Sequence, residues 1–489
     1  MENQASDRII FFDSKEVVVI GVLLDEASNT DHLVIEFSSR NNSGRPVRKL
    51  AELFESTSEK FFRKRNIPAI YFFARTNEWW QTPSIFKAIQ AVQDYGIRAR
   101  YKDICTYGLS MGGYGALMFS KKLQVDRVVA IAPQYSIDSQ VVPFETRWQD
   151  DRSRVQFQYD DMAEGLIKQG QVVVFYDRFF EFDHLHVEMI EKHRPVDRFL
   201  VNFSTHTVAR SLNDMGILSR VMERVLTNQM SKREFVEVIR RARKKSPLTL
   251  HNMADALKKG GHQRYATDVY ALSIDVMEQR IQQKPDYYMR KELAFASIRV
   301  IEGYLRNVTQ LGLLTQYMYQ RCRALVERFD LIPNYIGWTV IQAKSEFSLG
   351  NVEAARLLVR SAVPNVRDTE ATKFLRFYVQ ILSEQPVLED LEIMMQHFHK
   401  HILANDVTAV KFGTLLLQVN QPVKAQRYLD YYQRNFKRWY DKPDLMRQQL
   451  LALVQCNPAR AQSLLESAFA NDQYNKEYLS LKQELAVYH

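Results

Sequence analysis

The first half of the chain alternates short apolar runs with longer amphipathic stretches. The apolar runs are rich in β-branched and aromatic residues, which is typical of strands buried on both faces. The pattern predicts eight strands, at 8–12, 17–24, 33–37, 69–73, 104–107, 128–132, 172–176 and 199–203. It predicts helices between them, at 49–64, 83–95, 111–123, 160–168 and 183–192.

The order of these elements predicts the fold class. From the third strand onward strands and helices alternate, which favours a doubly wound, mostly parallel α/β sheet with helices on both faces. No helix separates the first two strands, so we expect them to form an antiparallel lead-in. A small cap is expected between 133 and 160, after the sixth strand.

The second half of the chain has no strand pattern. Short turns join helical stretches, and a weak period is carried by Ala355, Leu391, Ala425 and Ala461, at spacings of 36, 34 and 36 residues. This period resembles the tetratricopeptide repeat, whose unit is a pair of helices. A non-repeating helical array is the alternative. Both predict an all-α domain, and helical arrays often present surfaces to protein partners.

These two patterns predict three segments. Residues 1–228 form the α/β domain, 229–245 a basic helical linker, and 246–489 the α-helical domain that we expect to bind a protein partner. The linker carries the run Arg240-Arg241-Ala242-Arg243-Lys244-Lys245, for which a solvated helix face is favoured over contact with an acidic polymer or membrane surface.

Composition narrows the function classes. The 489 residues are 46% hydrophobic and 25% charged, as in ordinary globular proteins, with a formal charge of +9. No apolar run is long enough for a membrane span and no secretory signal is expected. Three well-separated cysteines favour a reducing, cytoplasmic location. The sequence has no nucleotide-binding, zinc-protease or nucleic-acid motif, so we expect no cofactor, no metal and no nucleic-acid partner.

One motif carries chemistry. Gly108-Leu109-Ser110-Met111-Gly112 lies between a predicted strand and a predicted helix. G-x-S-x-G in this context is a nucleophile elbow, in which a tight turn lifts the serine hydroxyl above the sheet. Glycine is needed on both sides because side chains there would collide with the strand and the helix. The helix N-terminus next to the serine favours a developing oxyanion.

A serine nucleophile needs a base and an acid that orients it. His206 follows the last predicted strand and is the candidate base. Asp177 directly follows the strand at 172–176 and is preferred as the acid. Asp183 is the alternative acid, although it also suits the N-cap of the next helix.

Further positions are expected to complete the site. The backbone N–H groups of Met111 and Ser38 are the candidate oxyanion hole, with Ser39 as the alternative to Ser38. Trp79 and Trp80 are candidates for substrate binding, as is Tyr135, because aromatic rings at the carboxyl edge of a sheet can stack on a sugar or line an acyl pocket. Packing of the tryptophans in the core is the alternative.

The stretch Thr106-Tyr107-Gly108-Leu109-Ser110-Met111-Gly112-Gly113-Tyr114-Gly115-Ala116-Leu117 resembles the α/β-hydrolase superfamily. Its S-M-G-G-Y form is similar to esterase branches such as S-formylglutathione hydrolases and antigen-85-like enzymes. The stretches at 77–81 and 133–136 are similar to bacterial hydrolase-like proteins found with surface-polysaccharide or glycosyltransferase functions. The resemblance covers about 15–225 and implies Ser110 as nucleophile, His206 as base and Asp177 as acid.

The expected function is a serine hydrolase that cleaves an ester, with an acyl group on a carbohydrate as one candidate substrate. An acyltransferase with the same triad is the second hypothesis. A non-catalytic or weakly catalytic assembly protein, which binds a partner through its helical half, is the third.

Overall fold

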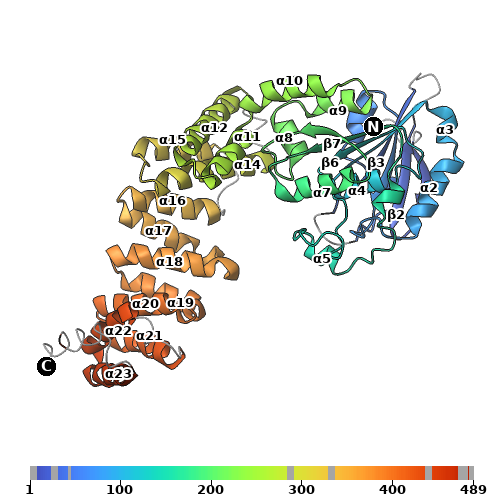
Figure 1. The fold of residues 1–489 in the computed structure, drawn as a ribbon. Helices are drawn as coiled ribbons and strands as arrows, with labels where there is room; N and C mark the ends of the chain where they lie inside the picture. The colour runs from blue at the N-terminus through green and yellow to red at the C-terminus, as the bar shows by residue number, and fades with distance from the viewer. Residues whose placement is uncertain are drawn as a thin grey trace. The chain divides into compact units, whose positions relative to one another are not determined.

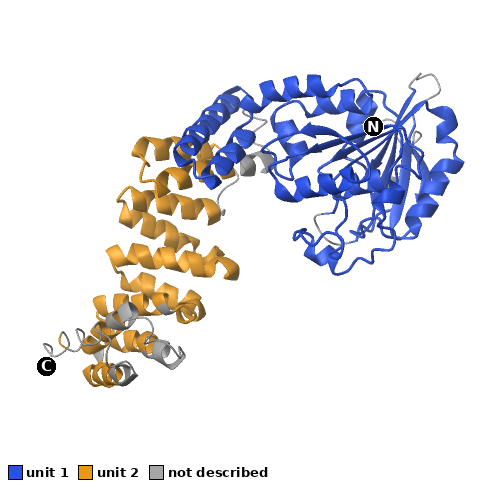
Figure 2. Ribbon diagram, in the orientation of Figure 1, with its two compact units in different colours: residues 1–283 blue, residues 284–489 orange. Residues whose placement is uncertain are grey.

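The computed structural model describes residues 8–23, 31–41, 46–283, 291–328, 336–435, 443–471 and 483. The chain divides into two compact units, residues 1–283 and 284–489 (Figure 2). No helix among the described residues has both the length and the apolarity to cross a bilayer.

The first unit is built on one eight-stranded sheet (Figure 1). Its spatial order is β1-β2-β4-β3-β5-β6-β7-β8. β1 is antiparallel to β2 and β2 to β4, whereas every other neighbouring pair is parallel. The strands are β1 (Arg8–Asp13), β2 (Val17–Val22), β3 (His32–Phe37), β4 (Ala69–Ala74), β5 (Asp103–Leu109), β6 (Arg127–Ile131), β7 (Gln171–Tyr176) and β8 (Asp197–Leu200).

The predicted fold class is therefore confirmed, and the first seven strands lie within two residues of their predicted bounds. The eighth, predicted at 199–203, lies earlier, at Asp197–Leu200. Residue 24, the predicted end of the second strand, lies outside the described residues. Strands such as β2, which is buried at all six positions, explain the nearly continuous apolar runs.

Helices cover both faces of the sheet (Figure 1). One core contains residues of α2 (Ser84–Asp94), α4 (Met111–Met118), α6 (Met162–Gly165) and α7 (Glu181–Glu191). The other contains residues of α1 (Glu59–Lys64), α8 (Val208–Asp214), α9 (Leu218–Leu226) and α10 (Lys232–Ala242). The short segments η1 (Ala51–Leu53), α3 (Ile97–Arg100), α5 (Gln149–Arg152) and η2 (Arg243–Lys245) complete this part.

The sequence predicts that the segment 229–245 is a basic helical linker. In the structure this segment instead packs within the first unit. Phe235 of its helix α10 is buried. The centroid of the Phe235 ring lies 4.7 Å from that of Phe199 in β8 and 5.4 Å from that of Phe175 in β7. The basic residues at its end are exposed, as a solvated face requires. α10 is a packed element of the first unit because it covers the last strands of the sheet.

The first unit also extends past residue 246, where the sequence begins the helical domain. It includes α11 (Pro247–Lys259) and α12 (Gln263–Gln283). Asn252 of α11 donates to the Phe203 carbonyl at 2.8 Å. Arg280 of α12 pairs with Asp214 of α8 at 3.2 Å. These contacts anchor both helices to the elements that follow β8.

The second unit is helical throughout its described residues. Its helices are α14 (Lys291–Gln310), α15 (Gln316–Glu327), α16 (Ile336–Ser348), α17 (Val352–Ala362), α18 (Asp368–Glu384), α19 (Leu388–Leu403), α20 (Asp406–Gln418), α21 (Pro422–Asn435), α22 (Pro443–Cys456) and α23 (Pro458–Asn471), with a short η3 (Val363–Asn365). They follow one another as a stacked series within this unit (Figure 1).

The four residues that mark the weak sequence period occupy equivalent places. Ala355, Leu391, Ala425 and Ala461 are each the fourth residue of their helix, in α17, α19, α21 and α23. All four are at most 1% exposed. The period thus marks the inward face of every second helix. Membership of the tetratricopeptide class stays a prediction.

Candidate active site

Ser110 occupies a strained turn between β5 and α4. Its backbone has φ 52° and ψ −120°, in a region that residues other than glycine rarely adopt. The Ser110 N–H donates to the Ile131 carbonyl at 2.9 Å, which ties the turn to β6. The side chain is only partly buried. This geometry is the one a nucleophile elbow requires.

The flanking glycines make that turn sterically possible. A Cβ on Gly108 would overlap the backbone of Gly112, and a Cβ on Gly112 would overlap the carbonyl of Phe37 at the end of β3. Both collisions are with backbone atoms, which cannot move aside as a side chain can. The two glycines therefore allow the serine turn to sit directly against the end of the neighbouring strand.

His206 reaches the serine as predicted. Its Nε2 lies 3.0 Å from Ser110 Oγ, within hydrogen-bond distance. The histidine sits in the loop between β8 and α8, where Phe203 (φ 65°) and Thr205 (φ 53°) adopt left-handed backbone conformations. The imidazole side chain is 21% exposed, so this dyad is open to a ligand at one side.

The carboxylate that faces His206 is Asp183, the alternative, and not Asp177. His206 Nδ1 lies 2.9 and 3.0 Å from the two Asp183 oxygens. Asp183 is the third residue of α7 and is fully buried, and Phe180 takes the N-cap place without a side-chain cap. The expectation that Asp183 serves as the N-cap is therefore wrong.

Asp177 instead holds the loop that carries the histidine. Its carboxylate accepts the N–H of Thr205 at 2.9 Å and the N–H of Phe179 at 3.0 Å. Burial raises the pKa of Asp177, against the lowering effect of these amide hydrogen bonds. The structure thus places Asp177 against the backbone of the residue before His206, and not against the His206 ring.

The predicted oxyanion donors differ in whether their backbone N–H groups already have an acceptor. The N–H of Ser38 donates to the Phe72 carbonyl at 2.9 Å, which extends the β3–β4 ladder and leaves this N–H no oxyanion to bind. Ser39, the alternative, is exposed and its N–H has no acceptor among the described residues. Met111 is the first residue of α4, where helix N–H groups lack partners inside the helix. The N–H groups of Met111 and Ser39 therefore stay the candidate oxyanion donors.

The loop after β3 has no glycines but is held by side-chain contacts. Ser39 Oγ donates to the Leu109 carbonyl at 3.0 Å, directly beside the serine turn. Arg40 Nε donates to the buried Asp151 at 2.6 Å. Asn77 bonds Asn41 twice, at 2.8 and 2.9 Å. These contacts hold the three consecutive residues 39–41 in place.

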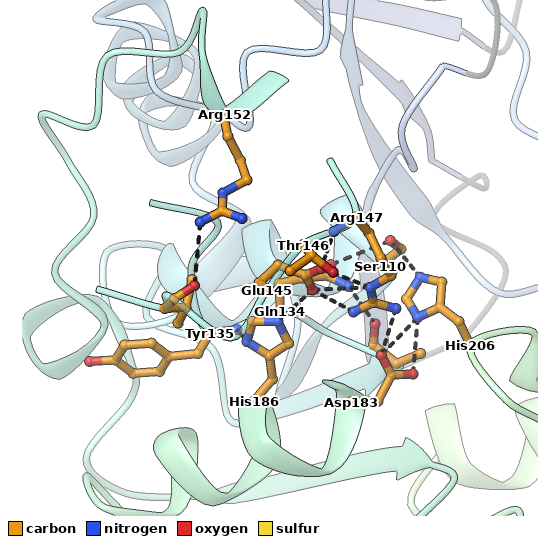
Figure 3. A network of polar contacts seen from close by, with 12 residues as sticks. Ser110, Gln134, Tyr135, Glu145, Thr146, Arg147, Arg152, Asp183, His186 and His206 are labelled. Carbon is orange, nitrogen blue, oxygen red and sulfur yellow. Dashed lines mark hydrogen bonds and ion pairs between the residues drawn. The ribbon is translucent and has the colours of Figure 1, made fainter. Parts of the chain in front are cut away.

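The aromatic residues predicted to bind substrate do not face the site. Trp79 and Trp80 are each 1% exposed, in the core that contains α4. Trp80 donates to the Met111 carbonyl at 3.0 Å, and Trp79 to Asp151 at 3.2 Å. The Tyr135 ring stacks on His193 at 5.6 Å and points away from Ser110 (Figure 3). The core-packing alternative describes both tryptophans.

Two site residues have no signal in the spacing of the sequence. The buried Gln134 lies with Oε1 3.3 Å from Ser110 Oγ. Arg147, in the cap, donates to Asp183 Oδ1 at 3.1 Å. Next to it the Trp148 ring lies 5.9 Å from the His206 ring, so the cap forms one wall of the site.

A second cluster secures the Gln134 loop. Asp160 accepts from Tyr114 of α4 at 2.7 Å and from Ser136, two residues after Gln134. Burial raises the pKa of Asp160 to about 6, although both hydrogen bonds oppose this shift.

No group of metal-ligating side chains occurs among the described residues. The arrangement brings a hydroxyl, an imidazole and a buried carboxylate together in this order, the set of side chains that acyl transfer through a serine requires.

Comparison with known proteins gives structural likenesses only. No family model and no curated protein match the chain. Among solved structures, the capsule O-acetyltransferase of Neisseria meningitidis serogroup A aligns at 12% identity over 44% of this chain and 94% of its own, with a TM-score of 0.33. Est1E from Butyrivibrio proteoclasticus aligns at 11% identity over 46% and 99%, with a TM-score of 0.32.

The Glycosylation Associate Protein (Gap123) complex from Streptococcus agalactiae aligns at 13% identity, over 46% of this chain and 47% of that chain, with a TM-score of 0.33.

Proposed function

We propose that the first unit is a serine hydrolase that cleaves an ester through Ser110, His206 and Asp183. One observation carries this proposal. A serine in a strained turn at a helix N-terminus lies 3.0 Å from an imidazole whose other nitrogen lies 2.9 Å from a buried carboxylate. A merely structural serine has no need of this strained backbone or of this ordered pair of partners.

In the first step Ser110 Oγ attacks the ester carbonyl carbon while His206 Nε2 takes the hydroxyl proton. Asp183 accepts the Nδ1–H hydrogen bond, which keeps Nε2 unprotonated beforehand and stabilises the imidazolium afterwards. The carbonyl oxygen becomes an oxyanion within reach of the N–H groups of Met111 and Ser39. One such donor is typically worth about 10²–10³ in rate.

Collapse of the tetrahedral intermediate breaks the bond to the alcohol oxygen, which leaves with the proton from His206. The products are a free alcohol and an acyl group on Ser110. A water then gives a proton to His206 and attacks the acyl carbon, and Ser110 recovers its proton as the acid leaves. Trp79 and Trp80, the residues expected to stack on a sugar, are buried in the core. The substrate is therefore an ester whose alcohol is left open.

Hydrolysis of p-nitrophenyl acetate tests this proposal. We expect Ser110→Ala to lower kcat by about 10³-fold or more, since the nucleophile is lost, and to leave the fold intact. Ser153→Ala, an exposed serine of the cap, is the matched control and should keep full activity. A folded S110A protein with undiminished turnover would refute the proposal.

Two further expectations stay predictions. Replacement of water by an acceptor alcohol would make the same site an acyltransferase, and product analysis with and without an alcohol acceptor separates the two reactions. Binding of a protein partner by 246–489 is to be tested by capture with the full-length chain.

A further inference from the structure

Buried polar groups continue beyond the triad and return to it (Figure 3). Arg147 joins Asp183 to Glu145, with Nε–Oε1 and Nη2–Oε2 contacts of 2.9 and 2.6 Å on the glutamate. Glu145 Oε2 lies 3.0 Å from His186 Nε2. His186 Nδ1 accepts the N–H of Tyr135 at 3.1 Å. Tyr135 follows Gln134, whose side chain contacts Ser110, so the contacts form a closed ring.

The hydrogen bonds assign protons around this ring. His186 Nδ1 accepts from a backbone N–H and so carries no proton, which leaves the Nε2–H to donate to Glu145. Burial lowers the pKa of His186, in agreement with a neutral imidazole. For Glu145 burial acts to raise the pKa, but hydrogen bonds from His186 and Arg147 outweigh it and lower the pKa to about 2. Glu145 is therefore ionised.

The charges have a consequence for the triad. Arg147 by itself would cancel the negative charge of Asp183, which is the charge that stabilises the His206 imidazolium. Glu145 adds a second carboxylate on the other side of the guanidinium. Two anions and one cation leave one net negative charge, so the guanidinium can hold Asp183 in place without neutralising the site.

This arrangement is buried and geometrically restricted. The side chains of Glu145, Asp183 and His186 are 0% exposed, and that of Arg147 is 18% exposed. The Arg147 guanidinium also lies over the rings of Phe182 and Phe180, at 5.0 and 5.3 Å. An arginine fixed by two carboxylates and two rings has little freedom to follow a displaced partner.

We propose that Arg147 is a positioning residue for the proposed ester hydrolysis: it fixes the Asp183 carboxylate against His206. The Glu145–His186 pair fixes Arg147 in turn and, through the Tyr135 amide, the loop that places Gln134 beside Ser110. This inference rests on the proposed function, and it makes the cap segment 145–147 part of the site's support.

The test compares Arg147→Met, Arg147→Lys and the double variant Glu145→Gln/Arg147→Met. The single methionine variant leaves two buried carboxylates without their cation, so it is expected to lose stability as well as activity. The double variant removes one charge of each sign and keeps the net charge at Asp183, which makes it the informative protein. Arg98→Met, which breaks a paired Arg98–Asp126 contact away from the site, is the matched control.

For the double variant we expect kcat on p-nitrophenyl acetate to fall about tenfold with KM within about twofold, because a loosened acid affects the transition state and not ester binding. R147K keeps the positive charge but cannot bond Asp183 and Glu145 with the same geometry, so its kcat should lie between those of wild type and R147M.

A folded double variant with the wild-type kcat would overturn the inference. Failure of the proposed function is a different result, because then the wild-type protein itself shows no activity that depends on Ser110.

Discussion

Replacement of the buried acid separates the two candidate aspartates. Asp183→Asn keeps the size and burial of the side chain but removes its charge. The amide oxygen can accept from Arg147 or from His206 Nδ1, since both lie within hydrogen-bond distance of Oδ1, at 3.1 and 3.0 Å. Arginine is a donor only, so it attracts the amide oxygen and leaves the amide N–H₂ for the imidazole.

This orientation of the new side-chain amide favours the His206 tautomer that is protonated on Nε2, which is the wrong one for a general base. An imidazole that accepts at Nδ1 carries its proton on Nε2 and cannot take a proton from Ser110. We therefore expect D183N to lower kcat by about 10²–10⁴-fold, equivalent to about 3–5 kcal/mol in the activation free energy. Because Arg147 enforces the amide orientation, the loss should lie toward the upper end of this range.

Asp177→Asn is the matched control, with the same chemical change six residues earlier. Phe179 and Thr205 donate to different oxygens of Asp177, so the new side-chain amide keeps one of these hydrogen bonds and loses the other. We expect a stability loss of about 1–3 kcal/mol and a labelling rate within about tenfold of wild type. The assay is the rate of covalent labelling by a fluorophosphonate probe, with thermal unfolding as the check on folding. A folded D183N that labels at the wild-type rate, or a folded D177N that loses as much as D183N, would refute this assignment.

Two more predictions concern the support of the site. Gly112→Ala places a Cβ against the Phe37 carbonyl and should lower the free energy of unfolding by about 3 kcal/mol or more in urea titrations, whereas Gly260→Ala, whose Cβ meets only ordinary contacts, should change it little; equal stability of the two variants would speak against the tight elbow. Burial raises the pKa of Asp160 to about 6 from 3.8, so the fold favours its protonated form, and wild-type stability should fall as pH rises from about 4 to 6. The stability of Asp160→Asn relative to wild type should grow over the same window by up to about 3 kcal/mol, and a constant difference would contradict the assigned burial effect.

The strands and the Ser110–His206 pair could be predicted because their signals are local. Buried strands are short apolar runs, and the carboxyl ends of parallel strands bring the elbow and the histidine loop to one edge. The acid could not be chosen in this way. Asp177 and Asp183 both follow β7, and the turn between them decides which carboxylate points at the ring and which binds backbone amides.

The tryptophan pair shows a different limit. Trp79 and Trp80 have φ values of 51° and 62°, and this unusual turn directs both side chains into the core. The pattern of apolar residues along a sequence does not predict a left-handed backbone conformation. A signal did exist in α4, since a Cβ on Gly115 would lie 2.7 Å from Trp80 Nε1, and the small residue there leaves room for the indole. Arg147 lies in an irregular cap, where no periodicity predicts which way a side chain points.

The most direct test of the account is to locate a covalent adduct. The full-length protein is treated with a fluorophosphonate, digested, and its peptides are mapped by mass spectrometry. The account predicts one stoichiometric phosphonate on Ser110, absent when His206→Ala removes the base. A folded protein that carries no adduct, or whose adduct lies on another serine, would contradict the claim that Ser110 is the nucleophile.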